Sequence, residues 1–74
     1  MKMISLTMVR ATIVDEDEIE REVTSPVRVN PVYIRSMNPR KEDKPGSRIT
    51  FADGGGFAVS ETLEQIEAAI ERAA

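Results

Sequence analysis

The sequence contains no cysteine, no histidine and no tryptophan, and its aromatic residues are one tyrosine and two phenylalanines. Without cysteine the chain has neither a disulfide framework nor a thiolate metal site. Without histidine it lacks the commonest general base and the commonest activator of a nucleophile. Carboxylates and lysines remain, but the acids crowd into a predicted turn and an exposed helix face. We therefore predict a protein that is not an enzyme and that uses no cofactor and no metal.

The chain is short, with 74 residues and no long apolar run. This length predicts one domain, residues 1–74, whose core must come from side-chain packing and whose stability margin is thin. Self-association would add to this thin stability margin, so a homo-oligomer is expected. The opening residues, Met1–Thr7, alternate polar and apolar side chains and do not resemble a secretory signal or a membrane span. We expect a cytoplasmic protein.

Alternating polar and apolar residues predict strands, and one stripe with a period near 3.6 predicts a helix. Together these patterns predict a small α+β fold: an antiparallel sheet of four to five strands, a projecting N-terminal hairpin, and one C-terminal helix packed on the sheet. The expected strands are Met3–Val14, Ile19–Val29, Val32–Met37, Arg48–Ala52 and Phe57–Val59, and the expected helix is 60–73. The expected core comprises Ile4, Leu6, Met8, Ile13, Val27, Val29, Ile34, Met37, Ile49, Phe51, Phe57, Val59, Leu63, Ile66 and Ile70.

The first hairpin carries a change of parity and a run of acids. Ile4 and Met8 are even-numbered but Ile13 is odd, so either a bulge near Arg10–Ala11 shifts the register or the far end leaves the core. The four acids Asp15–Glu18 suit an exposed tip, and residues 13–23 are expected to project. A Ca²⁺ loop is the alternative, but it needs a glycine that this segment lacks.

Proline and glycine mark the other boundaries. Pro26 predicts a sheet edge, a bulge or a break between two short strands, and Asn30–Pro31 predicts a turn. Residues 40–46 have the composition of a loop. Asp53–Gly56 predicts a hairpin turn; a phosphate cradle is the alternative, but these glycines lead into a strand and not into a helix. The helix starts at Ser60, or at Thr62 with Gln65 as a capping box.

The net charge is −3, and the charged residues are distributed unevenly along the chain. Residues 15–22 hold six acids and one arginine, whereas residues 35–48 hold five basic residues and two acids. The second window, with one more arginine, permits a nucleic-acid-binding regulatory adaptor that uses a basic strand edge and loop. Its candidate contacts are Arg28, Arg35, Arg40, Lys41, Lys44 and Arg48.

Three short motifs support a family resemblance. They are Val27–Pro31 followed by Ile34, then Ile49 with Phe51 and Gly54, then Val59 with Glu61–Thr62 before an amphipathic helix. This order resembles the small FlbD-type flagellar proteins and similar short phage and prophage proteins of unknown function. The chain differs from the flagellar members in its acidic hairpin, residues 9–26, and in the three glycines of its turn. The resemblance therefore implies a phage-encoded or accessory module and supplies no catalytic residue.

The function that the sequence favours is a non-enzymatic protein-interaction or assembly module. A small sheet with free edges and a projecting hairpin can pair with another protein or with a second copy by strand addition. Val32 and Tyr33, next to a turn, are candidate partner contacts; the alternative is that both cover the edge of the core. Nucleic acid, a membrane and a small-molecule substrate are not expected as partners.

Overall fold

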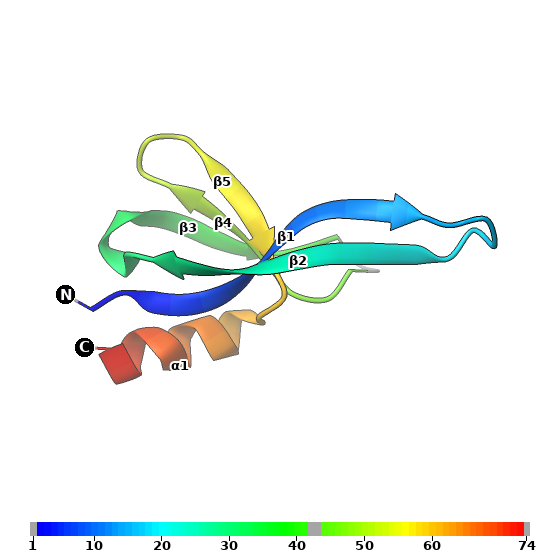
Figure 1. Ribbon diagram of the computed structural model, residues 1–74. Coiled ribbons are helices and arrows are strands. Elements are labelled where there is room, and N and C mark those ends of the chain that lie inside the picture. The colour runs from blue at the N-terminus through cyan, green and yellow to red at the C-terminus, as the bar shows by residue number, and fades with distance from the viewer. Residues whose placement is uncertain (1, 42–43, 74) are drawn as a thin grey trace.

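The computed structural model describes residues 2–41 and 44–73, which form one five-stranded antiparallel sheet and a C-terminal helix (Figure 1). The predicted α+β fold is thus confirmed. Residues 42 and 43 of the predicted loop lie outside the described residues. The elements are β1 (Ile4–Val14), β2 (Glu20–Val29), the 3-10 helix η1 (Pro31–Tyr33), β3 (Ile34–Pro39), β4 (Ser47–Phe51), β5 (Gly56–Val59) and α1 (Leu63–Ala73).

The sheet has the strand order β2-β1-β5-β4-β3 and is strongly curled. Its two edge strands, β2 and β3, are joined by Asn30 and the three residues of η1, and each residue of η1 advances the chain by only about 2 Å. A flat sheet of five strands would separate its edges by about 19 Å, four inter-strand spacings of about 4.8 Å. The sheet therefore bends so that its two edges approach each other.

The β1–β2 hairpin is the longest feature of the molecule and projects from the rest (Figure 1). The ladder shifts register between Val9 and Ala11, so the bulge near Arg10–Ala11, one of the two alternatives that the sequence left open, is observed. Pro26 pairs with Thr7 in an unbroken edge strand, where its missing N–H need not face a neighbouring strand. Of the three possibilities for Pro26, the sheet edge is the one observed.

The core lies between the inner face of the curled sheet and α1. Its buried members are Ile4, Leu6, Val29, Ile49, Val59 and Ile66, and those packed against them are Val27, Ile34, Met37, Phe51, Phe57, Ala69, Ile70 and Ala73. Met8 and Leu63 are partly buried. The prediction for Ile13 is wrong, because its side chain is 53% exposed. The bulge returns Ile13 to an apolar face, but that part of the hairpin extends beyond the layer that covers the core.

Two predicted element boundaries are also corrected. Val32 and Tyr33 belong to η1, because the Asn30 side chain accepts from the Val32 amide and the Tyr33 amide donates to the Asn30 carbonyl. The third strand therefore runs over Ile34–Pro39. The helix starts at Leu63 and not at residue 60, because the Ser60 amide donates to the Thr7 carbonyl of β1.

The helix start is set by the second predicted signal, the capping box. The Thr62 hydroxyl accepts from the Gln65 amide at 3.2 Å, and the Gln65 side chain accepts from the Thr62 amide at 2.8 Å. Just before it, Glu61 ties the turn to two strands. Its carboxylate accepts from the Thr7 amide at 2.8 Å, and its carbonyl accepts from the buried Ser47 hydroxyl at 2.9 Å. These bonds fix α1 against the sheet.

The glycine-rich segment forms the hairpin turn that the sequence predicts. The Phe51 amide donates to the Gly55 carbonyl, and the amide of Gly54, which adopts φ 95°, donates to the Phe51 carbonyl. The Asp53 carboxylate accepts from the Gly55 amide at 2.9 Å. The Asp53 side chain and the partner strand thus satisfy the backbone of this turn.

Candidate interaction surfaces

The first candidate surface is the arm, defined as residues 11–23: the ends of β1 and β2 beyond the bulge, and the tip between them. Cross-strand pairs place Ala11 opposite Val23 and Ile13 opposite Arg21, so Ile13 and Val23 share one face of the arm. Apolar side chains here are 41 to 59% exposed. They are Ile13, Val14, Ile19 and Val23.

The tip of the arm is built around Asp15. Its carboxylate accepts from the amides of Asp17 and Ile19, and its own amide donates to the Ile19 carbonyl. Glu18 adopts φ 60°, a left-handed conformation that closes the turn. Arg21 lies 3.7 Å from the Asp15 carboxylate. The arm is therefore an ordered hairpin whose tip presents the exposed carboxylates of Glu16, Asp17 and Glu18.

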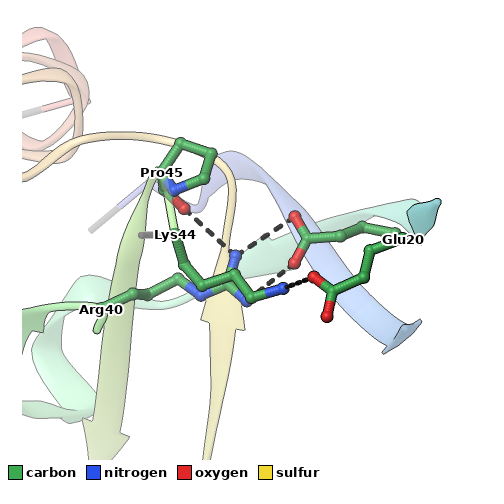
Figure 2. Close-up of polar contacts among 5 residues, drawn as sticks. Glu20, Arg40, Lys44 and Pro45 are labelled. Carbon is green, nitrogen blue, oxygen red and sulfur yellow. Dashed lines mark hydrogen bonds and ion pairs between the residues drawn. The ribbon is translucent and has the colours of Figure 1, made fainter. Parts of the chain in front are cut away.

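The β2 strand of the arm is held by the segment that follows β3. Figure 2 shows Arg40 and Lys44 reaching from this segment toward the glutamates of β2. Arg40 donates to both carboxylate oxygens of Glu22, at 2.7 and 3.2 Å, and also to the Pro45 carbonyl at 3.1 Å. Lys44 pairs with Glu20. The two edges of the sheet are thus joined by ion pairs at one end and by η1 at the other.

These contacts lower the pKa of Glu22. The main cause is the hydrogen bond from Arg40, which stabilises the ionised carboxylate. Partial burial acts in the opposite direction, and the positive charges of Arg40 and Lys44 add to the lowering. Glu22 therefore stays ionised, and paired with Arg40, to a lower pH than an isolated glutamate would.

The six basic residues predicted as nucleic-acid contacts fall into two groups, those that pair with carboxylates of this chain and those that are exposed. Arg40 and Lys44 face carboxylates of the same chain. Arg28, Arg35 and Arg48 are exposed on β2, β3 and β4. The sixth candidate, Lys41, is exposed after β3. Two of the six charges are thus already neutralised within the molecule, which weakens the electrostatic attraction for phosphates.

The second candidate surface is an apolar cleft between the start of β1, the end of β2, η1 and the β4–β5 turn. Figure 1 shows that these segments lie at the end of the molecule opposite the arm tip. The volume of the cleft is about 830 Å³, within the range of natural ligand pockets. Its floor includes Phe51 and Phe57, whose ring centroids lie 5.3 Å apart. The cleft is lined by Met3, Val27, Arg28, Val29, Asn30, Tyr33, Phe51, Ala52, Asp53 and Phe57.

The two predicted partner contacts differ in their relation to this cleft. Tyr33 lines it and is 60% exposed, whereas Val32 is 59% exposed and does not line it. The side chains of both are therefore mainly in solvent, which disfavours a role in covering the core edge. Sequence reasoning missed the cleft itself. A usable signal was the number of inward-facing apolar residues, which is larger than one short helix can cover.

Within residues 2–41 and 44–73, no group of three or more Asp or Glu side chains is placed to hold a metal ion. The same described segments contain no helix that is long and apolar enough to cross a membrane. No protein-family model matches the chain, and comparisons with curated proteins and with solved structures give no match either.

Proposed function

We propose that this protein is a non-enzymatic assembly module that binds another protein chain through the arm. The observation that carries the proposal is the exposure of four large aliphatic side chains on an ordered, anchored hairpin. Apolar residues scattered singly on a surface are common, but here several lie on one projecting element and two of them, Ile13 and Val23, share a face, which is typical of an interaction site. Covering these side chains would remove apolar surface from water and so drive association.

The arm is suited to this role because it needs little ordering on binding. Its ladder is complete from Ala11 to Val14 on one strand and from Glu20 to Val23 on the other. The free edge of β2 also offers backbone groups for strand addition by a partner. A preformed element avoids part of the entropy cost of association.

The absence of histidine and cysteine from the sequence supports a role without catalysis. The resemblance to short phage and flagellar proteins supports an accessory part in an assembly. That origin and a cytoplasmic location remain predictions. Nucleic-acid binding is the weaker alternative, and a steep fall in DNA affinity between two salt concentrations would support it.

The proposal is tested with an arm variant, Ile13→Asp combined with Ile19→Asp, and a matched control, Val32→Asp. All three sites are exposed, so each variant should fold. Wild-type protein and both variants are immobilised, and the proteins that they retain from a lysate of the source organism are quantified. Each protein retained by the wild type is then purified and titrated by calorimetry.

We expect the wild type and Val32→Asp to bind the same purified partner, and the arm variant to bind it at least about tenfold more weakly, because two buried apolar contacts are lost. Equal binding by all three would exclude the arm as the contact. If binding is lost only in Val32→Asp, the contact lies on η1 and not on the arm. A chain that binds no protein, including itself, would overturn the proposal.

A further inference from the structure

The arm is a two-stranded ribbon, so it has two edges, and they differ in how well they are protected. On the β2 side the edge carries the charged residues Glu20–Glu22, and the side chains of Arg40 and Lys44 reach across to it (Figure 2). Charged side chains at an edge hinder pairing with a further strand. The β2 side of the arm is therefore the less accessible one.

The β1 side of the arm is open. β5 pairs with β1 only at Met8 and Val9, and within residues 2–41 and 44–73 no strand continues that pairing over Ala11–Val14. Figure 1 shows β1 running on past β5 into the arm. The segment Ala11–Val14 contains no charged residue, no proline and no glycine, and all of it is exposed. An exposed edge without such protection is a template for another strand.

The register of the arm decides which backbone groups face this open edge. The Asp15 amide donates across the hairpin to the Ile19 carbonyl, and the ladder is regular from Ala11 to Val14. In an antiparallel ladder every second residue directs its N–H and C=O to the same side. Asp15 and Ile13 therefore face β2, whereas Thr12 and Val14 direct their N–H and C=O outward.

The charges next to this edge match those of its own antiparallel copy. Arg10 lies just before the open segment and Glu16 just after it, and both are exposed. In the part of the chain that the structure describes, neither side chain forms an ion pair. When two such strands run antiparallel, the arginine of each lies beside the glutamate of the other. Parallel strands would place like charges together.

We infer that the partner of the arm is the arm of a second copy of this chain, paired with it along the β1 edges about a two-fold axis. This inference rests on the proposed function and identifies the partner. With the axis at Ile13, the two Ile13 side chains lie opposite each other, and Thr12 of each copy exchanges N–H···O=C bonds with Val14 of the other. Arg10 lies opposite Glu16. Because both copies use the same edge, the contact closes at a dimer.

Two constraints select this register. A shift by one residue would set Thr12 opposite Ile13, whose backbone groups face β2, so the bonds between the copies could not form. A shift by two residues toward the body would bring each tip against β5, which already pairs with Val9. The register centred on Ile13 avoids both conflicts and covers apolar side chains that the monomer leaves in solvent.

Charge reversal tests the pairing of Arg10 with Glu16. Sedimentation of the wild type over a concentration series should show a monomer–dimer equilibrium that saturates at the dimer mass. Arg10→Glu and Glu16→Arg should each raise the dissociation constant at least about tenfold, because both attractive pairs become repulsive. An equimolar mixture of the two variants should form a heterodimer at least as tight as the wild-type dimer, since its pairs are attractive again.

The matched control is Arg28→Glu, which changes the net charge as Arg10→Glu does at an exposed position outside the arm. It should dimerise like the wild type. Circular dichroism with thermal melting checks that every variant folds.

A single cysteine tests the register, because the chain has none of its own. Ile13→Cys places one thiol of each copy at the axis, in a non-hydrogen-bonded pair whose Cα atoms lie about 4.5 Å apart, within the range of a disulfide. With oxidised glutathione as the oxidant, Ile13→Cys should form a covalent dimer at least about tenfold faster than Val32→Cys. Val32 is a suitable control, since it is 59% exposed and Ile13 is 53% exposed.

Three results would overturn the inference. A dimer that both charge reversals leave unchanged, and that Ile13→Cys does not cross-link, would place the contact elsewhere. A mixture of the two charge variants that associates no better than either alone would show that Arg10 and Glu16 do not meet. A chain that stays monomeric at every concentration, but binds a different purified protein through the arm, would overturn self-pairing and leave the proposed function standing. A chain that binds neither itself nor any other protein would overturn both.

Discussion

At its base the β1–β2 hairpin buries Ile4 and Leu6 in the core, whereas beyond the bulge the same two strands leave Ile13 and Val23 in solvent. The alternation of polar and apolar residues is present in both halves once the bulge has corrected the register. What differs is the covering layer. The base has α1 above it, whereas among the described residues the apolar side chains Ile13 and Val23 of the arm stay exposed.

This contrast separates residues that the fold needs from residues that it does not. Removing apolar surface from water stabilises the monomer only where another part of the chain does the covering. Ile4 meets this condition and Ile13 does not. The aliphatic residues of the arm therefore need an explanation outside the stability of one molecule, and the association that we propose would provide one.

The largest expected effect comes from the matched pair Ile4→Ala and Ile13→Ala, two isoleucines of the same strand. Ile4 is 3% exposed, so its truncation leaves a cavity and should lower the free energy of unfolding by about 2 to 5 kcal/mol. Ile13→Ala should change it by no more than about 0.5 kcal/mol in the monomer. Urea denaturation at low protein concentration measures both. Equal losses would mean that the arm packs against the body.

A second comparison concerns a buried and an exposed serine. Ser47 is fully buried and donates to the Glu61 carbonyl, so Ser47→Ala leaves that acceptor without its partner and should cost about 1 to 2 kcal/mol. Ser36→Ala, at an exposed position of β3, should stay within about 0.5 kcal/mol. The same denaturation experiment compares them. A neutral Ser47→Ala would show that the turn before α1 is held mainly by the Glu61 side chain.

Much of the fold follows from local patterns in the sequence. The bulge at Arg10 is implied by the parity of Ile4 and Ile13, and the capping box by the spacing of Thr62 and Gln65. The glycine turn is implied by Asp53–Gly56. In each case the interacting groups lie close along the chain, so spacing alone is informative.

The curl of the sheet and the surfaces it creates could not be predicted in this way. Arg40 and Glu22 are 18 residues apart and Lys44 and Glu20 are 24 apart. Their pairing depends on how far a five-stranded sheet bends, which no local pattern specifies. The sequence alone therefore permits an external partner for the basic segment, although Arg40 and Lys44 pair with carboxylates of the same chain. The cleft has the same origin, because it exists only once the curl brings β2, η1 and β4 around one opening.

The smallest expected effect tests how the arm is attached. The pKa of Glu22 is lowered in the folded state, so the unfolded chain binds its proton more readily. The stabilisation from Glu22 is then fully present above the usual glutamate pKa of about 4.3 and is lost as the pH falls through the lower folded value. A double-mutant cycle with Glu22→Gln and Arg40→Gln should give a coupling of at most about 1 kcal/mol at pH 7. The coupling should shrink as the pH falls through the lowered pKa of Glu22. A coupling near zero at pH 7, together with a loss of stability in Arg40→Gln alone, would mean that Arg40 holds the arm through its bond to the Pro45 carbonyl and not through its charge pair with Glu22.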